Sequence, residues 1–375
     1  MEGCDGLIHF DKKLITLTDF YDNIECNDEN KINYIESRNE LTKVTHIQRY
    51  KPDNKVLCVS TKTGNFLICQ SNHILFIKKN NIHEKYSNKY CRLIGNNEYI
   101  EYMSTRKPFK INDENIKEIY SNELKIYDTI WIDNSISVFN NKNIKPELSG
   151  YMCGIYCAEG SKIWSNRKTK GNFISQKNEG VIKEKIIQEC NINYERTTVT
   201  KKGIWLWDNN QNINKIILGN YSWTKRLNID FIDYDKNWLS DFLAGWIDGD
   251  GTVFTNSSTC CRIYTTSYYL AQQLKMICLK LGYKCNVCTI PPNKGFKRSR
   301  IQFICDLRFP VKPYIDSEKL KISGNIKLSV TRPFDKIICG FDTITKIKEI
   351  EWPYCIYDIK TEKGEYMLNC IQNHN

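Results

Sequence analysis

The stretch Leu243-Ala-Gly-Trp-Ile-Asp-Gly-Asp-Gly251 has a partner earlier in the chain, Met152-Cys-Gly-Ile-Tyr-Cys-Ala-Glu-Gly160. Each is an apolar run that predicts a helix, and each ends in an acidic residue followed by glycine. Both carry small residues four positions apart, Gly154 and Ala158 in one and Gly245 and Gly249 in the other. Because this spacing places the small residues on one helix face, the two helices can approach closely and their last turns can meet.

The acids at the two helix ends are Glu159 and Asp250, and we expect their carboxylates to converge. Gly160 and Gly251 are expected to let the chain leave each helix sharply. Converging carboxylates suit Mg²⁺, which is usually held by one or two carboxylates, water and phosphate oxygens. The pair therefore predicts metal-dependent hydrolysis of a phosphodiester, although either motif alone is typical of an ordinary helix end.

The charge balance favours a polyanionic partner. Lys and Arg total 54 against 43 Asp and Glu, a formal net charge of +11. A Lys-rich coding bias gives the same excess, so the charge is supporting evidence only. Two segments are rich in basic residues, Arg167–Lys170, with Trp164 just before it, and Lys294–Arg300, which contains Phe296. They predict contacts to phosphates and an affinity for nucleic acid that falls as the salt concentration rises.

Cysteine use and hydropathy address the compartment. The 17 cysteines are scattered and odd in number, which favours a reducing compartment over a disulfide framework. No apolar stretch approaches the ~20 residues of a membrane span, and the N-terminus lacks a secretion signal. We expect an intracellular protein, cytoplasmic or nuclear, that is neither secreted nor membrane-bound. Cys285 and Cys288 have zinc or redox spacing, but a single such pair favours core packing.

Organisation changes twice along the chain. Up to about residue 135 it predicts short strands, from about 142 to 310 it predicts helices mixed with strands, and after about 322 strands return. This order predicts one β-module that is split by an α+β insertion. The expected strands and helices are Gly6–Phe10, Lys55–Ser60, Asn65–Cys69, Ile74–Ile77, Leu124–Ile132, Leu148–Ala158, Glu179–Glu189, Trp238–Ile247, Tyr268–Leu281, Lys284–Ile290, Arg300–Leu307, Lys336–Gly340, Thr343–Glu351, Cys355–Thr361 and Tyr366–Ile371.

The paired acidic motifs resemble those of LAGLIDADG homing endonucleases that carry two motifs in one chain. The second copy matches closely, and the first matches at its Gly-x-x-x-Ala-Glu-Gly core; the acids are 91 residues apart. The resemblance implies a monomer with pseudo-two-fold symmetry that cuts double-stranded DNA, with Glu159 and Asp250 as catalytic metal ligands for Mg²⁺. Trp223–Leu227 resembles a block that carries a basic catalytic residue, so Lys225 is the candidate. Asn228 replaces the proline of that block, so surface solvation of Lys225 stays open.

The flanking β-module resembles inteins, the protein-splicing elements with a Hint-type fold. The segment Glu365–Asn375 ends in His-Asn, and an Asn side chain can attack its own carbonyl to release whatever follows. In the resemblance, Asn375 cyclises, His374 assists by proton transfer, and Asp358 is the catalytic or assisting acid. Gly64–His73 resembles the block whose histidine activates the N-terminal peptide bond, with Gln70 where threonine is usual, which makes His73 the candidate.

The N-terminal residue departs from the intein pattern. Met1 stands where inteins carry a nucleophilic cysteine or serine, and methionine has no thiol or hydroxyl to acylate. Cys4 lies too close to the Ile8 strand for the usual register. Met1 replaces a native nucleophile, marks a mis-set start, or belongs to an element that has lost N-terminal splicing, and the residues do not choose among these.

The expected architecture is a multidomain chain, an all-β Hint-type module split by an α+β LAGLIDADG endonuclease. The boundaries are 1–135 and 322–375 for the two halves of the Hint module and 145–310 for the endonuclease. The expected partners are double-stranded DNA and, for an intein, host-protein segments on both sides. Two other functions stay open: a freestanding intein-derived endonuclease that does not splice, and a maturase-like nucleic-acid-binding protein that does not cut.

Overall fold

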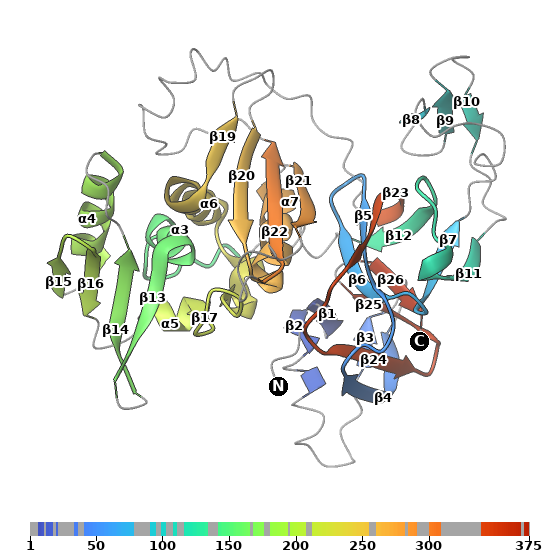
Figure 1. Ribbon diagram of the computed structural model, residues 1–375, viewed down its shortest axis with the longest axis horizontal. Helices are drawn as coiled ribbons and strands as arrows, with labels where there is room; N and C mark the ends of the chain where they lie inside the picture. The colour runs from blue at the N-terminus through green and yellow to red at the C-terminus, as the bar shows by residue number, and fades with distance from the viewer. Residues whose placement is uncertain are drawn as a thin grey trace. The chain divides into compact units, whose positions relative to one another are not determined.

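A computed structural model describes residues 7–10, 13–17, 20–21, 34–36, 41–78, 91–94, 99–102, 108–110, 116–133, 142–165, 168–175, 181–193, 196–207, 212–254, 260–281, 284–290, 300–308, 339–368 and 371–374. The chain divides into two compact units, whose elements are labelled in Figure 1. Unit 1 is Met1–Val138, Val287–Ile301 and Asp335–Asn375, and unit 2 is Phe139–Asn286 and Gln302–Phe334.

Unit 1 is rich in strands that come from both ends of the chain. Its N-terminal part also holds the short 3-10 helix η4 (Ser121–Glu123). The strands are β1 (Leu7–Phe10), β2 (Lys13–Thr16), β3 (Tyr34–Glu36), β4 (Leu41–Tyr50), β5 (Val56–Thr61), β6 (Phe66–Gln70), β7 (Ile74–Lys78), β8 (Cys91–Ile94), β9 (Tyr99–Tyr102), β10 (Pro108–Lys110), β11 (Ile116–Tyr120), β12 (Thr129–Asp133), β23 (Cys339–Ile350), β24 (Ile356–Thr361), β25 (Glu365–Leu368) and β26 (Ile371–His374).

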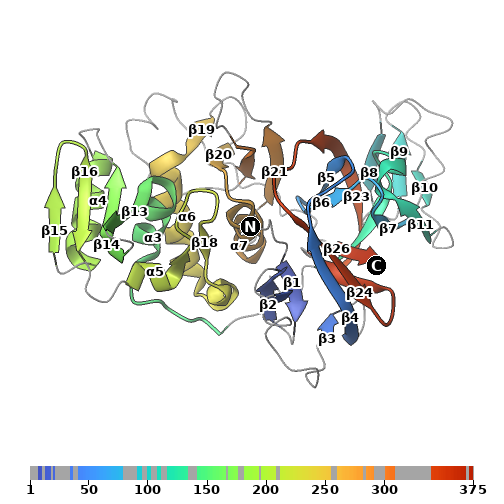
Figure 2. The same ribbon diagram turned by 60° about the horizontal axis from the view of Figure 1, so that its bottom comes forward.

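N-terminal and C-terminal strands of unit 1 pair with each other. The longest sheet follows the order β2-β1-β25-β26-β12-β23-β5-β6, with β7 and β11 beside it, and two smaller sheets follow the orders β24-β4-β3 and β10-β9-β8. Strand β23 pairs with both β5 and β12, and β24 pairs with β4 along its whole length. Figure 2 shows β24, in red, beside β4, in blue. The two ends of the chain therefore build one unit.

Two tight turns in unit 1 share one sequence pattern, Thr-x-x-Gly. In the turn between β5 and β6, the N–H of Gly64 donates to the carbonyl of Thr61 at 3.1 Å, and Gly64 has φ +96°. In the turn between β24 and β25, Gly364 makes the same bond to Thr361 at 3.2 Å with φ +76°. Glycine suits both positions because side chains rarely adopt positive φ.

The apolar core of unit 1 draws on strands from both parts of the chain. One cluster joins residues of β5, β6, β7 and β12 to Ile344 and Ile371, and a second contains Ile35, Ile359 and Tyr366. Strand β5 is buried along its whole length, which explains its nearly continuous apolar sequence.

Some sequence-based boundaries in unit 1 differ from the structure. The segment expected as one strand, Tyr366–Ile371, is a hairpin in which β25 turns back into β26. The strand expected from Leu124 begins only at Thr129, because η4 and a turn precede it. Of the strand expected at Lys336–Gly340, only residues 339 and 340 are described, and they begin β23.

Unit 2 contains two successive sets of elements. The first set is α3 (Gly150–Glu159), β13 (Gly160–Ser165), β14 (Lys168–Ser175), α4 (Val181–Asn193), β15 (Arg196–Val199) and β16 (Gly203–Trp207). The second set is α6 (Lys236–Asp250), β19 (Thr252–Phe254), β20 (Cys260–Thr265), α7 (Tyr268–Leu281), β21 (Lys284–Ile290) and β22 (Gln302–Arg308). Between them lie α5 (Asn212–Ile216), β17 (Ile217–Leu218), β18 (Arg226–Leu227) and the 3-10 helix η5 (Ile229–Asp233).

The two sets have the same order of elements and the same strand order. Each runs helix, strand, strand, helix, strand, strand. The sheets are β13-β14-β16-β15 and β19-β20-β22-β21, so the last strand of each set lies inside its sheet. The division into units falls within β21, whose residues from Val287 onward count with unit 1.

Helices α3 and α6 begin at polar caps. The side chain of Ser149 accepts a hydrogen bond from the N–H of Met152 at 3.1 Å, and the carboxylate of Asp235 accepts from the N–H groups of Asn237 and Trp238. These caps satisfy donors that the first helical turn leaves without partners. Among the described residues, no helix combines the length and apolar character needed to cross a membrane.

The two helices end at glycine for a reason that differs from the expectation. Gly160 and Gly251 have φ −80° and −76°, so neither adopts the left-handed conformation that favours glycine. A Cβ atom at Gly160 would instead lie 2.2 Å from the Tyr156 ring, and one at Gly251 would lie 2.5 Å from the Ile247 carbonyl oxygen. Space, not backbone strain, requires glycine at both helix ends.

Candidate functional site

Helices α3 and α6 lie side by side in both ribbon views and touch through their backbones (Figures 1 and 2). A Cβ atom at Gly150, Gly154 or Gly245 would lie 2.1 Å from a carbonyl oxygen of the facing helix, at Trp238, Phe242 and Tyr151 respectively. A Cβ at Gly249 would lie 2.5 Å from the Cβ of Ala158. The close approach expected from the small residues is therefore present. Gly150, which the sequence reasoning missed, continues the same four-residue spacing.

The close packing brings the ends of the two helices together. A Cβ at Gly249, next to Asp250, would lie 3.6 Å from Cγ of Glu159. Glu159 is half-buried and Asp250 is exposed. Burial raises the pKa of Glu159, the negative charge of Asp250 raises it further, and the ammonium group of Lys225 opposes both. The negative charge of Asp250 therefore reaches Glu159 and makes ionisation of its carboxyl group less favourable.

Lys225 lies immediately before β18 and reaches the end of α3. Its side-chain Nζ donates to the carbonyl oxygens of Tyr156 at 2.9 Å, Cys157 at 3.0 Å and Gly160 at 2.7 Å. The residue is 6% exposed, and Nζ lies 5.2 Å from the centre of the Tyr156 ring. Burial lowers the pKa of Lys225, and the nearby Cys157, Asp250 and Glu159 act against that change. Lys225 is thus a buried group close to both acids and is not solvated at the surface.

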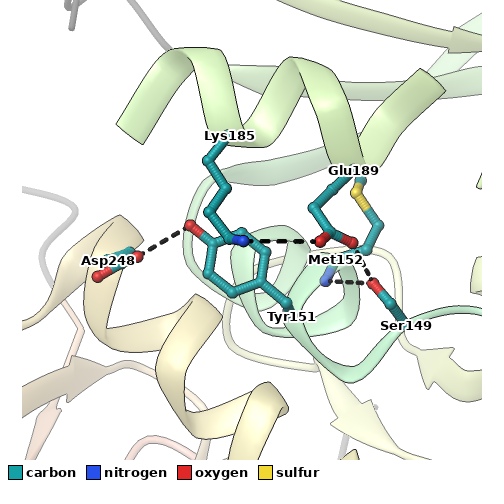
Figure 3. A network of polar contacts seen from close by, with 6 residues as sticks. All are labelled: Ser149, Tyr151, Met152, Lys185, Glu189 and Asp248. Atoms are coloured by element: carbon teal, nitrogen blue, oxygen red, sulfur yellow. Dashed lines mark hydrogen bonds and ion pairs between the residues drawn. The ribbon is translucent and has the colours of Figure 1, made fainter. Parts of the chain in front are cut away.

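A partly buried polar network joins α3 to α6 and α4 (Figure 3). The hydroxyl of Tyr151 donates to the Asp248 carboxylate at 2.9 Å. This bond joins α3 to α6 two residues before Asp250. Lys185 of α4 lies over the Tyr151 ring at 5.2 Å. Glu189, one turn further along α4, accepts from the Ser149 hydroxyl at 2.7 Å. These contacts fix the rotation of α3 and therefore the direction in which Glu159 leaves its helix.

The sequence reasoning did not find this network. Asp248 lies inside the quoted nonapeptide, and an acid within an apolar helical run was a signal that it would need a buried partner. Lys185 and Glu189 are four residues apart on α4 and 3.9 Å apart as an ion pair. That spacing is typical of neighbours on one helix face.

The two carboxylates suit a hard cation that takes most of its ligands from water and phosphate oxygens. No group of three or more His, Cys, Asp or Glu side chains that could hold a metal ion occurs among the described residues. A pair of carboxylates is nevertheless the protein contribution that Mg²⁺ commonly receives, with water and phosphate oxygens completing its shell. Glu159 and Asp250 are of the right chemical type for that arrangement.

One comparison bears directly on this site. Residues 237–308 match the LAGLIDADG-like domain. The matched segment begins in α6, contains Asp250 and ends with β22, so it covers the second set of elements in unit 2. The match supports a relationship to the LAGLIDADG homing endonucleases and suggests a function in DNA binding and cleavage. No curated protein matches the chain.

The LAGLIDADG-like segment leaves the other candidate residues outside it. Glu159 and Lys225 lie N-terminal to the match, and all of the β-rich unit except residues 287–301 lies outside it. Within the match, Cys285 is buried and Cys288 is partly exposed, and both are free thiols. No disulfide is formed by the following described cysteines: Cys58, Cys69, Cys153, Cys157, Cys190, Cys261, Cys278, Cys305 and Cys355.

Most of the basic clusters fall outside the described residues. Arg167 and residues 294–299, which include Phe296, are not described. For Trp164, Lys168 and Lys170 only the backbone is described. Arg300 is described, and its guanidinium donates to the Tyr354 hydroxyl at 3.3 Å. The phosphate contacts expected of these clusters stay predictions.

In the β-rich unit, His73 contacts the C-terminal strand β26. Its Nε2 atom is 3.1 Å from Oδ1 of Asn373, a residue 300 positions away. Asn373 is buried, and its side-chain amide donates to the carbonyl of Ile371 at 2.8 Å. Because Asn373 is two residues before Asn375, this contact brings the block around His73 to the C-terminal block.

The other candidate splicing residues are placed less completely. Asp358 lies on β24 and accepts a hydrogen bond from the side chain of Gln48 at 3.3 Å. His374 is the last residue of β26 and is opposite Glu365 in the β25–β26 hairpin, although its side chain is not described. Met1, Cys4 and Asn375 lie outside the described residues.

Proposed function

We propose that the protein is a site-specific endonuclease that hydrolyses phosphodiester bonds in double-stranded DNA. The observation that carries the proposal is the pairing of Glu159 and Asp250 at the ends of two helices that touch through their backbones. The LAGLIDADG-like match around Asp250 supports it, because homing endonucleases of this kind cut DNA. The net charge of +11 agrees with a polyanionic substrate.

We further propose that the first set of elements in unit 2 is a diverged copy of the second, related to it by pseudo-two-fold symmetry. The identical element order and strand order of the two sets support this relationship. So does the equivalent position of Glu159 and Asp250, each the last residue of the first helix in its set. On this proposal each acid serves one of the two DNA strands, and one chain suffices for a double-strand cut.

Glu159 and Asp250 would hold the divalent cation, for which Mg²⁺ is the expected ion. A bound Mg²⁺ supplies positive charge to the phosphate and lowers the pKa of its bound water. The chain contributes the rest. Glycine contacts set the separation of the two helix ends, the Tyr151–Asp248 bond fixes their rotation, and burial of Glu159 limits the water around its carboxylate.

The test compares cutting and binding separately. The substrate is a library of double-stranded DNA that includes the gene's own flanking sequences joined without the coding segment. With Mg²⁺ the wild-type protein should nick or cut a subset of it. Glu159→Gln and Asp250→Asn should lose cutting by at least about 10²-fold, since each removes a charge that acts on the reacting phosphate, and both should keep DNA affinity.

The matched control is Glu184→Gln, which removes an exposed acid from α4. It should cut as well as wild type. Full cutting by both site variants would rule out the two-acid mechanism. Binding by the wild type with no cutting under any divalent cation would instead favour the maturase-like alternative.

A second function is supported in the β-rich unit, and we propose it as a Hint-type splicing module. The contact between His73 and Asn373 supports the proposal, because splicing requires residues from both ends of the element in one place. Pairing of β25 with β1 and of β24 with β4 supports it further. With Met1 at the nucleophile position, only the C-terminal reaction, cyclisation of Asn375, is expected.

The splicing test fuses reporter domains to both ends, with serine or cysteine after Asn375. Release of the C-terminal reporter should depend on Asn375 and should slow in His374→Ala. Met1→Cys should restore N-terminal cleavage, and His73→Ala should then remove it. A fusion that releases neither reporter in any of these forms favours the freestanding endonuclease. A gene whose reading frame stops directly after Asn375 would favour the same alternative.

A further inference from the structure

The strongest unassigned arrangement in unit 2 is the environment of the Lys225 ammonium group. An ammonium group has three N–H donors and no acceptor. The three bonds to Tyr156, Cys157 and Gly160 use all three donors, at distances between 2.7 and 3.0 Å. Each acceptor is a backbone carbonyl oxygen, so these bonds do not depend on which side chains those positions carry.

The acceptors are distributed around Glu159 in the sequence. Tyr156 and Cys157 belong to the last turn of α3, where carbonyl groups lack partners within the helix, and Gly160 is the first residue after it. The ammonium group therefore joins the chain before Glu159 to the chain after it. The Tyr156 carbonyl also accepts the N–H of Gly160, so two bonds tighten the same turn. The backbone at Glu159 is therefore held from both sides.

Lys225 is itself held in place. The hydroxyl of Ser267 donates to the Lys225 carbonyl at 2.6 Å, and the side-chain amide of Gln273 bonds both the N–H and the carbonyl of Leu227 at 2.8 Å. Ser267 and Gln273 are buried at the start of α7 and within it. Lys225, which binds the end of α3, is therefore itself held by residues of the second set of elements. Asp250 belongs to the same set.

Contact between Lys225 and a DNA phosphate would require these bonds to break. The residue is 6% exposed, and moving the ammonium group away would leave three carbonyl oxygens without the donor that they have now. A lysine that binds phosphate in a cleft needs donors free to reach it. The geometry of Lys225 is that of a helix-end clamp.

We propose that Lys225 is a positioning residue that fixes the backbone on both sides of Glu159 and thereby sets the geometry of the Glu159–Asp250 pair before DNA binds. The inference rests on the proposed function for the identity of the pair as metal ligands. It differs from a role for Lys225 at the reacting phosphate, because it assigns the effect to the free protein.

The test measures metal binding in the absence of DNA. Binding of Mg²⁺ is followed by calorimetry and binding of Tb³⁺ by its luminescence, for wild type, Lys225→Met and Lys225→Arg. Methionine keeps most of the length of the side chain without the ammonium group. Arginine keeps the charge, but its planar donors do not match three converging carbonyls. Both variants should bind either ion at least about 10-fold more weakly, while DNA affinity without metal stays within about twofold of wild type.

Lys280→Met is the matched control. Lys280 is also buried, and its ammonium group donates to the carbonyl of Ile232, but the charges around it are Asp233, Asp235 and Lys236. This variant should lose thermal stability as Lys225→Met does, yet keep the metal affinity of wild type. Equal loss of metal affinity in both variants would reduce the effect to general destabilisation and overturn the proposal.

Two further outcomes separate the inference from the proposed function. If wild type binds metal and Lys225→Met binds it equally well, the positioning role is wrong. A drop in DNA affinity or in single-turnover rate that Lys225→Arg restores would then assign Lys225 to the phosphate. If wild type itself binds no metal at Glu159 and Asp250, as judged by Glu159→Gln, the metal site of the proposed function fails and the inference fails with it. Should Lys225→Met not fold, Lys225→Arg decides between the two roles.

Discussion

Among single residues, Glu159 is held where ionisation of its carboxyl group is less favourable than in water. Burial and the charge of Asp250 both raise its pKa, and Lys225 offsets only part of this effect. A carboxyl group whose pKa is raised in the folded state binds its proton more tightly there than in the unfolded chain. Its contribution to stability is therefore greatest at low pH and is lost as pH rises through the folded-state pKa.

Glu159→Gln should therefore stabilise the metal-free protein at neutral pH. After allowance for the half-exposure of Glu159 to solvent, we expect a gain in unfolding free energy of up to about 1 kcal/mol. The gain should vanish at low pH, where wild-type Glu159 is protonated in both states. Urea unfolding at a series of pH values measures it, with Glu184→Gln as the exposed control. A loss of stability at neutral pH would contradict the assignment of repulsion between the two acids.

Among the secondary-structure elements, α3 and α6 approach so closely that the glycine positions between them have no room for a side chain. At Gly150, Gly154 and Gly245, a carbonyl oxygen of the facing helix occupies the space where a Cβ atom would lie. Helices at this separation have little freedom to slide, because protein interiors are close-packed. The close packing of α3 and α6 therefore also restricts the positions of Glu159 and Asp250 at the helix ends.

Gly154→Ala should separate the two helices. The added Cβ would lie 2.1 Å from the Phe242 carbonyl oxygen, so the backbones must move apart. We expect a loss of about 1–3 kcal/mol or more in unfolding free energy, together with loss of cutting. Ser240→Ala, at an exposed position of α6, is the control and should change stability by less than about 0.5 kcal/mol. Chemical denaturation and the cutting assay measure both; normal cutting by Gly154→Ala would show that helix separation does not matter.

At the scale of the whole molecule, the chain carries two sets of core residues. In unit 1 the apolar clusters come from strands at both ends of the chain. In unit 2 the buried set includes Ile155, Phe242, Leu243, Trp246, Leu274 and Ile277. Units that each have a core of their own are expected to unfold as separate cooperative steps.

Calorimetry should therefore resolve two thermal transitions. Gly154→Ala should lower the midpoint of one of them, and Ile344→Ala, which opens a cavity in a unit 1 cluster, should lower the other. Single variants that shift both midpoints equally, or a single transition in the wild type, would show that the two units unfold as one.

The sequence predicted some local elements and the contact between α3 and α6 well, because both follow from patterns within short segments. The bounds of α7 and β21 agree with the expected segments, and the spacing of Gly154 and Gly245 identified the helix contact. Partners that are distant in sequence were missed. The bond between Tyr151 and Asp248 and the clamp of Lys225 depend on how helices and loops are placed in space, and periodicity carries no such information.

The same limit explains the errors at strand boundaries. An apolar stretch such as Tyr366–Ile371 has the composition of one strand, and its reversal depends on pairing of β25 with β1 and of β26 with β12. Gly160 and Gly251 were assigned to a conformational need, whereas their role is to leave room for Tyr156 and Ile247. Residue identity alone does not separate these two uses of glycine.

The pairing of β23, β24 and β25 with β5, β4 and β1 has a consequence for biosynthesis. A ribosome delivers the chain from its N-terminus, so β1, β4 and β5 emerge long before these C-terminal partners. The two sets of elements in unit 2 are complete, by contrast, once β22 has emerged. Pairing of strands over such separations is slow, because it requires closure of a very long loop. Unit 2 should therefore be folded while the edges of β1, β4 and β5 that will pair with C-terminal strands are still exposed. A nested unit that folds quickly would hold those distant strands within reach of each other and so shorten the interval in which they are open to aggregation.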